Sequence, residues 1–588
     1  MFMGCESFLD TDNLTKKDSS SFPKTEADVN MLIAATYQTI VQIAPLNNPF
    51  FMSDLASDDR FGGAGQSDRD NRAIGRLKRN GEDQYKNPWQ QMYSAIFRVN
   101  TILNSMDMVA WSSEVNREAV EGESLFLRAY AYMNLCRTYG TVPLVLTTEQ
   151  VNLPRATPEE LWGQIASDFK AAIEKIPAIK FQAMDKSRLG HATKWAAESM
   201  MARAWLFYTG YYEEENMPLA DGGSISKEQV IDWLKDVVTN SGHGLLPNFW
   251  SLWPYSNEET SKDYKYMKKI KADYAQKYGD ITWIKEEGAN YENIFSYKYS
   301  SLADTYGENH ANQLVLYSSI RGWGVADAGA EMFPLGLGWG GGTVNPQLWD
   351  EWEANEPNDL RRQASIMDVR DPNEMDKYTW GGDGQMEETG YWNKKYIAMN
   401  AKRENDEGGI DYVNYSCILF NAPDDYRKNN TQDTYIMRFS DVLLMLAELT
   451  KDVSYINQVR DRVGLPALGA YTEEALRNER RYELCFEGIR YYDLLRWHIA
   501  GTQLDKKNGV PICNAGVWTT ANMGDMQKRI EETGGFFPIP VSQVNLSAGV
   551  FGTRPCMGRC WSYLYRLTRR GLAKIMLKSV FSQSSFSK

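Results

Sequence analysis

The stretch NERRYELCFEGIRYYDLLRW, residues 478–497, decides which fold this sequence predicts. It is rich in charged and in aromatic residues at once, a composition shared by catalytic clusters, binding faces and scaffold helices. Its apolar side chains recur at helical spacing and form one broad face: Leu484, Ile489, Tyr491, Tyr492 and Leu495. Because such a face packs against other helices, the stretch predicts a scaffold helix rather than a catalytic cluster.

The charges of the same stretch fit this interpretation. Arg480 and Glu483 stand one turn apart, as do Glu487 and Arg490, so we expect each pair to interact along the helix. Gly488 would lie in the middle of the helix, where glycine costs about 1 kcal/mol relative to alanine. We therefore expect that Gly488 allows close packing against a second helix.

Amphipathic patterns predict further helices in both halves of the chain. Thr25 is placed to cap the first of them, Gly140 ends another, and Thr157 precedes a third. Such helices in series indicate tetratricopeptide-like helix pairs, without a strict sequence period. The predicted helices are residues 26–40, 89–106, 121–140, 157–176, 192–212 and 439–449.

Two regions break the helical pattern. Residues 54–75 are rich in glycine and in charges of both signs, which predicts a long loop, and long ordered loops often carry function. Residues 241–435 contain many Gly, Trp, Tyr and Asn and few periodic runs. They predict an irregular, loop-rich subdomain that packs on the helices. The apolar run at 142–146 predicts a short strand or an extended segment.

The composition opposes several classes of protein. The formal net charge of −13 opposes binding to nucleic acid, whose phosphates need a basic surface, and opposes adsorption to an anionic membrane by charge alone. No run of residues is long and apolar enough to span a membrane. The 18 Trp and 33 Tyr predict many buried rings and, in loops, exposed rings on which the apolar face of a sugar can stack.

The sequence contains no recognisable catalytic or metal-binding motif. The four histidines are not at metal-ligand spacing, the seven cysteines form no disulfide or zinc pattern, and the glycine-rich residues 336–342 lack the lysine of a phosphate loop. We expect no cofactor, no catalytic residue and no metal site. Two alternatives stay open. A glycoside hydrolase needs only two of the 77 acidic residues, and scattered oxygens can hold structural calcium.

Both ends of the chain differ from the rest. Gly4 before Cys5 matches the end of a bacterial lipoprotein signal, whose Cys takes a lipid, although the basic and apolar regions of such a signal are missing. Cys5 is otherwise a chance match. From Ser547 onward the chain has no Asp or Glu. This end is either a native basic tail or the product of a shifted reading frame.

Several segments, taken in order from about Thr25 to Asn545, carry a family resemblance: SLFLRAYAYMNLCRTYGTVPLVL (124–146), ATKWAAESMMARAWLFY (192–208), NPQLWDEWEANEPNDLRRQASI (345–366), MRFSDVLLMLAEL (437–449), INQVRDRVGLPAL (456–468), LRNERRYELCFEGIRYYDLLRW (476–497) and FFPIPVSQVN (536–545). Together they resemble the SusD/RagB family of Bacteroidetes outer-membrane lipoproteins. Three departures are the truncated signal, a short connection after Leu449 and an unfamiliar ending after Asn545.

The resemblance implies a mostly α-helical fold in which a tetratricopeptide-like scaffold supports an irregular binding subdomain. It implies a non-enzymatic lipoprotein, held at the outer-membrane surface by a lipid on Cys5, that captures a glycan, or sometimes a peptide, and passes it to a SusC-type TonB-dependent transporter. The expected regions are a signal remnant (1–4), a flexible tether (5–22), one SusD-like body (23–545) with scaffold helices at about 26–240 and 436–500, and a basic tail (546–588).

Candidate ligand-binding residues follow from the chemistry of the loops, because the binding loops of the family vary with the glycan. One loop offers hydrogen-bond donors and a ring through Arg60, Phe61, Arg69 and Asn71. A second, glycine-rich region offers flat faces through Trp323 and Trp339. The aromatics of helical patterns, Trp195, Trp205 and Trp497, are expected in the core. The remaining alternatives are a hydrolase on a helical scaffold and a protein that binds peptides on a concave helical face.

Overall fold

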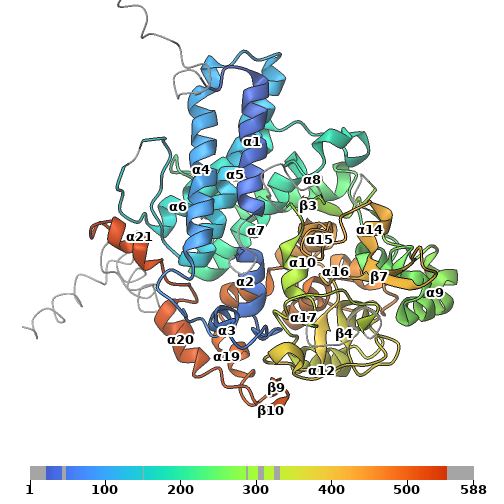
Figure 1. Ribbon diagram of the computed structural model, residues 1–588. Coiled ribbons are helices and arrows are strands. Elements are labelled where there is room, and N and C mark those ends of the chain that lie inside the picture. Colours follow the sequence, from blue (N-terminus) through green and yellow to red (C-terminus); the bar gives the residue numbers. More distant parts are fainter. Residues whose placement is uncertain are drawn as a thin grey trace, which may run out of the picture.

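The computed structural model describes residues 22–42, 48–149, 151–285, 289–301, 310–322 and 332–551. The predicted lipid site Cys5, the tether up to residue 21, Trp323 and the tail beyond residue 551 lie outside these ranges. Within them the protein is mostly α-helical, as predicted, with long helices on one side and short elements on the other (Figure 1). No helix among the described residues combines the length and hydropathy that crossing a membrane requires.

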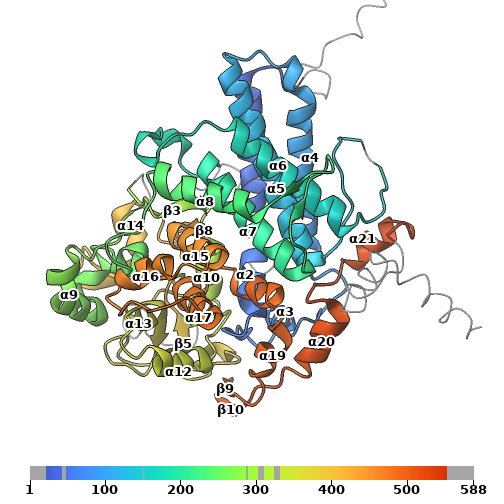
Figure 2. The same cartoon turned by 180° about the vertical axis from the view of Figure 1, so that it is seen from behind.

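Long helices dominate the N-terminal part, and each packs against the next in sequence. They run side by side in both views of the ribbon (Figures 1 and 2). This arrangement is the predicted scaffold of helix pairs. The helices are α1 (Glu26–Val41), α4 (Lys86–Ser105), α5 (Glu114–Tyr139), α6 (Pro158–Lys175), α7 (Lys194–Tyr212) and α8 (Lys227–Asn240).

The helix ends predicted at Thr25, Gly140 and Thr157 are correct because each is set by local sequence, whereas α4 and α5 begin earlier than the predicted residues 89 and 121. Thr25 and Thr157 both form capping boxes, in which the threonine hydroxyl accepts from a backbone N–H and an acidic side chain accepts in return. Gly140 follows α5 with φ +78°, a conformation that glycine adopts without strain. These ends fix the lengths of the scaffold helices independently of their packing.

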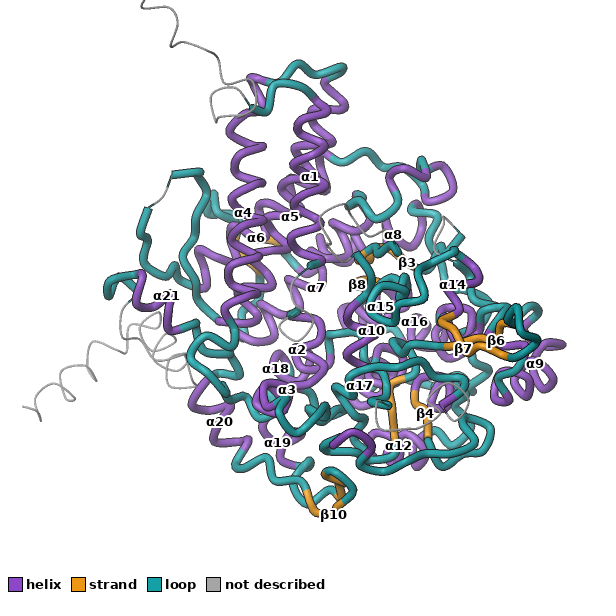
Figure 3. Tube along the Cα trace, in the orientation of Figure 1, coloured by secondary structure: helices purple, strands orange, loops and turns teal. Residues whose placement is uncertain are grey.

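The predicted loop at 54–75 is shorter than expected. Residues Pro49–Ala56 form α2, Arg69–Gly75 form α3, and only residues 57–68 connect them without a helix. Both helices are short and lie against the scaffold (Figure 3), so tertiary contact stabilises them. Neither helix was predicted from the sequence. The run at 142–146 is extended and forms one isolated bridge, between Pro143 and Arg155.

The scaffold continues in the C-terminal part. Helix α15 (Phe439–Thr450) packs against α7 and α8 as well as against its neighbours α16 (Val453–Asp461) and α17 (Glu473–Leu484). Helix α18 (Arg490–Arg496) contacts α7 and α2. The chain then adds α19 (Ala500–Asp505), β9 (Pro511–Asn514), β10 (Val517–Thr520), α20 (Met526–Thr533) and α21 (Val541–Leu546).

Residues 478–497 form the expected scaffold element, but they are two helices and not one. The chain leaves α17 after Leu484 and enters α18 at Arg490, and Gly488 between them has φ +72°. A Cβ atom at Gly488 would lie 2.6 Å from the Phe50 ring of α2. The expected close packing at this glycine is therefore present, at a turn between helices rather than inside one.

The predicted charge pairs within this stretch are wrong. Arg480 binds Asp441 at 2.6 Å and Asp493 at 2.9 Å. Glu483 instead receives Arg438 at 2.9 Å and Arg361 at 3.0 Å. The side chains point into the protein, where partners from distant segments are nearer than those one turn away.

Further ion pairs tie the turn to the rest of the molecule. Glu487 binds Arg438 and Lys395, each at 2.7 Å. Arg490 binds Asp58, in the loop before α3, at 2.8 Å. All of these side chains are buried. Around Glu483, Arg438 also binds Glu292, Arg361 binds Glu479, and Arg462 binds Glu483 itself. We call this central cluster the buried ion network: Arg361, Lys395, Arg438, Arg462, Glu292, Glu479, Glu483 and Glu487.

Short elements make up the middle of the chain. Among its described residues there are three two-stranded antiparallel sheets, β3–β8, β4–β5 and β6–β7, and β8 leads directly into α15. The elements are α9 (Lys265–Tyr278), β3 (Asn293–Tyr297), α10 (Gln313–Ser318), α12 (Pro346–Asn355), α13 (Arg361–Ser365), β4 (Ile366–Asp368), β5 (Tyr391–Asn393), β6 (Asn400–Glu404), β7 (Ile410–Asn414), α14 (Tyr415–Leu419) and β8 (Thr434–Arg438).

Two of the three tryptophans predicted to be buried, Trp195 and Trp205, are buried in the structure. Cys136 and Cys485 are buried as well. Trp497 was expected in the core but is partly exposed, since it follows the last residue of α18. The Arg496 guanidinium covers its ring, with Cζ 4.7 Å from the ring centroid.

Replacement of Gly488 by alanine tests the turn. A non-glycine residue in the left-handed conformation costs about 1–3 kcal/mol. We expect Gly488→Ala to lower the free energy of unfolding by more than this, because the new Cβ also meets Phe50. Gly509→Ala is the matched control, since Gly509 has φ +80° with nothing within 4 Å of its Cβ position. Urea unfolding gives both values, and equal losses would contradict the close packing.

Replacement of Glu483 by glutamine tests the buried ion network. We expect Glu483→Gln to lower the free energy of unfolding by about 3–5 kcal/mol, since the change leaves buried guanidinium groups without their counter-charge. Glu474→Gln, at an exposed position of the same helix, is the control and should change stability by less than about 0.5 kcal/mol. A Glu483→Gln variant as stable as this control would show that the network is dispensable.

Candidate functional site

The two loops predicted to bind a ligand lie against each other in the structure. Backbone hydrogen bonds join residues 61–64 to the glycine-rich residues 340–343: Phe61 N–H to the Thr343 carbonyl at 2.8 Å, and Gly342 N–H to the Gly62 carbonyl at 2.9 Å. The sequence therefore selected two segments that pack against each other, although they are about 280 residues apart. We call this contact the loop junction, residues 57–68 with 338–344.

Three of the predicted ligand-binding residues hold the loop junction from inside. Arg60, Phe61 and Asn71 are buried, with 1%, 0% and 1% of their surface exposed. Arg60 donates to the Gly342 carbonyl at 2.8 Å and pairs with Asp54 at 3.2 Å, and Asn71 donates to the Gly62 carbonyl at 3.2 Å. The prediction that these three face a glycan is wrong.

The reason lies in the glycines themselves. A glycine-rich segment brings backbone polar groups into the interior without side chains to satisfy them, so side chains of the facing loop turn inward and do so. Glu387 acts in the same way, since its carboxylate accepts the N–H groups of Gly62 and Gly63 at 2.9 and 3.2 Å. It also pairs with Arg76 at 2.7 Å.

Two other predicted residues reach the surface. Arg69 is exposed at the first turn of α3. Trp339 is half-buried, and the ring of Tyr317 meets it edge to face with centroids 4.6 Å apart. Arg321 lies next to Trp339 and bridges Asp383, at 2.9 Å, and Asp68, at 3.5 Å. Trp323, the sixth predicted residue, lies outside the described part of the chain.

Sequence reasoning missed a second aromatic pair, Trp380 and Trp518. Their ring centroids lie 4.8 Å apart at an interplanar angle of 52°. Trp518, on β10, is 54% exposed. All the other tryptophans that the structure describes are buried or only partly exposed. Tyr378 supports Trp380 from the edge at 5.2 Å. We call Trp380 and Trp518 the aromatic platform.

The aromatic platform is joined to the loop junction through the backbone. Glu388 and Cys513 exchange N–H···O bonds of 2.9 and 2.8 Å, which fixes the β9–β10 hairpin beside residues 385–388. Gln385 in turn donates to the Gly340 carbonyl at 2.9 Å. Both tryptophans stand beside Gly or Thr in short polar segments, which is the one local sign of exposure that the sequence offers.

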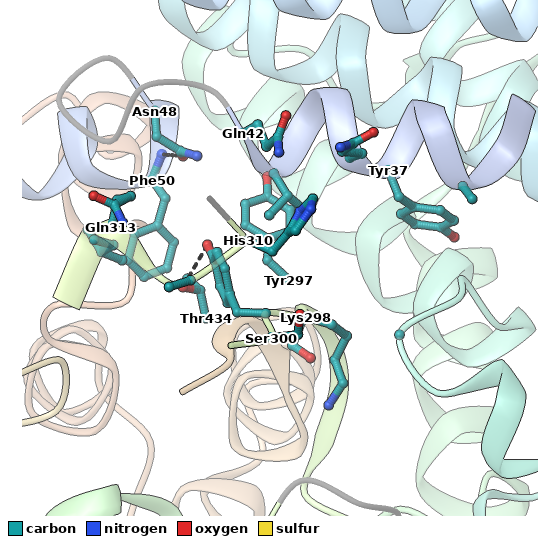
Figure 4. A pocket seen from close by; sticks show the side chains of 18 of the residues that line it. Tyr37, Gln42, Asn48, Phe50, Tyr297, Lys298, Ser300, His310, Gln313 and Thr434 are labelled. Atoms are coloured by element: carbon teal, nitrogen blue, oxygen red, sulfur yellow. Dashed lines mark hydrogen bonds between the residues drawn. The ribbon is translucent and has the colours of Figure 1, made fainter. Parts of the chain in front are cut away.

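A pocket of about 620 Å³ forms a second candidate site, between α1, the start of α2 and the β3 strand (Figure 4). Tyr37, Tyr297 and His310 face it with rings, and the lining given by the described residues contains no carboxylate. Glu123 lies behind Tyr37 and accepts from its hydroxyl at 2.7 Å and from His191 at 2.6 Å.

The chemistry of Glu123 is that of a structural carboxylate. Burial would raise its pKa, but hydrogen bonds and charge from His191 and Arg188 hold the pKa below its ordinary value. Both of its oxygens are occupied by these partners. The described lining of the pocket therefore presents rings, neutral polar groups and the cationic Lys298, and none of these residues supplies the pair of carboxylates that glycoside hydrolysis requires.

The described residues contain no group of three or more His, Cys, Asp or Glu side chains arranged to hold a metal ion. The four described cysteines, at positions 136, 417, 485 and 513, are free and buried.

Two family models match this chain over most of its length. One, described as "Starch-binding associating with outer membrane", matches residues 7–206, and the other, the SusD family, matches residues 292–551. The protein belongs to the SusD/RagB family. The matched ranges include both sides of the loop junction and the stretch 478–497, so the resemblance expected from the sequence is confirmed.

Individual SusD relatives are distant in sequence. A SusD-like protein of Bacteroides ovatus is 21% identical over 70% of this chain and 65% of its own length. The SusD-like protein P25 of Formosa agariphila is 23% identical over 84% of this chain and 87% of its own length.

Solved SusD-like structures share the fold. Surface glycan-binding protein A from Bacteroides fluxus superposes with a TM-score of 0.66 at 20% identity, over 91% of this chain and 99% of that one. A laminarin-binding SusD-like protein gives 0.64 at 21% identity, over 89% and 98% of the two chains. The Bacteroides thetaiotaomicron surface glycan-binding protein A, in complex with laminarihexaose, gives 0.63 at 18% identity, over 90% and 99%.

Proposed function

We propose that this protein binds a glycan at the cell surface, at the aromatic platform and the adjoining loop junction, and performs no chemistry on it. The observation that carries the proposal is the exposure of Trp518 beside Trp380. An exposed indole on a folded scaffold loses water when it stacks on the apolar face of a sugar, and little conformational entropy is lost on binding.

Polar groups near these rings supply the other half of sugar recognition. Arg321 and Asp383 form a partly exposed pair beside Trp339, and Arg69 adds an exposed cation on α3. The guanidinium groups can donate hydrogen bonds to sugar hydroxyls, and the Asp383 carboxylate can accept hydrogen bonds from them. Solved relatives in complex with laminarihexaose and with a xylogluco-oligosaccharide support a glycan as the ligand class.

We further propose that the protein is anchored at the outer membrane through a lipid on Cys5 and delivers its glycan to a SusC-type TonB-dependent transporter. Family membership and the Gly4–Cys5 sequence support this role. Immunoprecipitation of the native protein from solubilised outer membranes should recover such a transporter. Recovery of the protein alone, from a soluble fraction, would contradict both the anchor and the partner.

Calorimetry with a panel of laminarin, xyloglucan and starch oligosaccharides tests glycan binding. We expect one of these glycans to bind, and Trp518→Ala to weaken that binding about tenfold or more, since truncation of a central tryptophan costs about 2 kcal/mol. Phe97→Ala is the control, because Phe97 is an equally exposed ring, at 53%, on the remote helix α4.

The same experiment separates the alternatives. Loss of binding in Trp339→Ala but not in Trp518→Ala would move the site to the Tyr317–Trp339 pair. Release of shorter sugars during the titration would indicate a hydrolase. Binding of peptides, with no glycan bound by the folded protein, would overturn the proposal.

A further inference from the structure

A small cavity lies where the N-terminal and C-terminal scaffold helices meet. It has a volume of about 20 Å³, and four arginines line it: Arg137 of α5, Arg203 of α7, Arg480 of α17 and Arg496 of α18. Apolar side chains of α7 and α15, the side chains of Ile489 and Tyr492, and Asp493 of α18, whose carboxylate pairs with Arg480 and Arg496, complete the wall. A cavity of this volume holds one atom-sized occupant, since a water needs about 10–15 Å³.

Three carboxylates compensate three of these four cations. Asp441 binds Arg480 at 2.6 Å and also binds Arg203. Asp493 binds Arg480 at 2.9 Å and Arg496 at 2.8 Å, and Glu448 completes the set by binding Arg496. Four guanidinium groups thus face three carboxylates, which leaves one positive charge in the interior.

The excess charge belongs to Arg137. This side chain is 6% exposed, donates to the neutral amide of Asn134 at 2.8 Å and lies over the ring of Tyr492 at 4.2 Å. Within the described ranges it forms no ion pair, and its Nε–H and that of Arg203 have no acceptor. Burial lowers the pKa of Arg137, and the nearby charge of Arg203 acts in the same direction.

A buried guanidinium stays charged, so its charge requires a counter-ion. Arginine does not deprotonate in proteins, and an unpaired charge in the interior costs several kcal/mol. A water molecule would accept the two unpaired N–H groups but would leave the charge uncompensated. At about 20 Å³ the space suits one atom-sized species better than a carboxylate-containing metabolite, phosphate or sulfate.

We propose that this cavity is a binding site for one small monovalent anion of the halide class, held by the guanidinium groups of Arg137 and Arg203. The anion connects α5 and α7 to α17 and α18, and so joins the two ends of the scaffold. Because it binds the folded chain only, its concentration sets part of the protein's stability.

Thermal unfolding of the full chain in sodium chloride and in sodium acetate, at equal ionic strength, tests the site. We expect the unfolding temperature to rise with chloride concentration in the wild type and to lose this dependence in Arg137→Met, which removes the excess charge. Acetate is too large for the cavity. Arg403→Met, at a 42% exposed arginine of β6, corrects for general salt effects and should keep the wild-type dependence.

Crystals soaked in sodium bromide give a direct second measurement. An anomalous peak within hydrogen-bond distance of Arg137 Nε supports the site, even if Arg137→Met fails to fold. The absence of a peak, together with equal unfolding temperatures in chloride and acetate, would overturn the proposal and assign the cavity to water. So would an Arg137→Met variant that retains the full chloride dependence.

Discussion

One fully buried carboxylate, that of Glu483, organises the centre of this molecule. Burial alone would raise its pKa, but Arg462, Arg438 and Arg361 hold the pKa well below its ordinary value. These arginines come from three places: the end of α16, the end of β8 and the start of α13. Each charge would be costly to bury alone, so the three segments gain stability only when they assemble together. These ion pairs therefore join the scaffold helices to the irregular subdomain.

The same principle explains how an irregular surface is held in place. The glycine-rich residues of the loop junction have no side chains that could bind their own backbone groups. The buried side chains of Arg60, Asn71 and Glu387 form hydrogen bonds with these backbone groups instead. Inward-facing polar residues then cannot serve as ligand contacts. Rings at the edge of the fastened backbone, Trp380 and Trp518, remain free to face solvent. A family that varies its ligand can change such edge residues while the interior bonds stay constant.

Most buried arginines of this interior pair with carboxylates, and Arg137 beside the cavity is an exception. The buried ion network pairs every arginine that it contains with carboxylates. Arg137 instead donates to an amide and lies over a ring. Since the cavity lies between helices from both ends of the scaffold, an occupant there would act on the same assembly that Glu483 stabilises.

The sequence by itself determined the helical class, the family and several ends of the long helices, because caps such as Thr157 and stops such as Gly140 act within one turn. It also selected two loops that lie against each other in the fold. Only the tertiary structure decided the partners of the charges and the exposure of the rings. Glu483 meets Arg361 across 122 residues and Trp380 meets Trp518 across 138, and contacts at such separations leave no local periodicity that could be recognised in the chain.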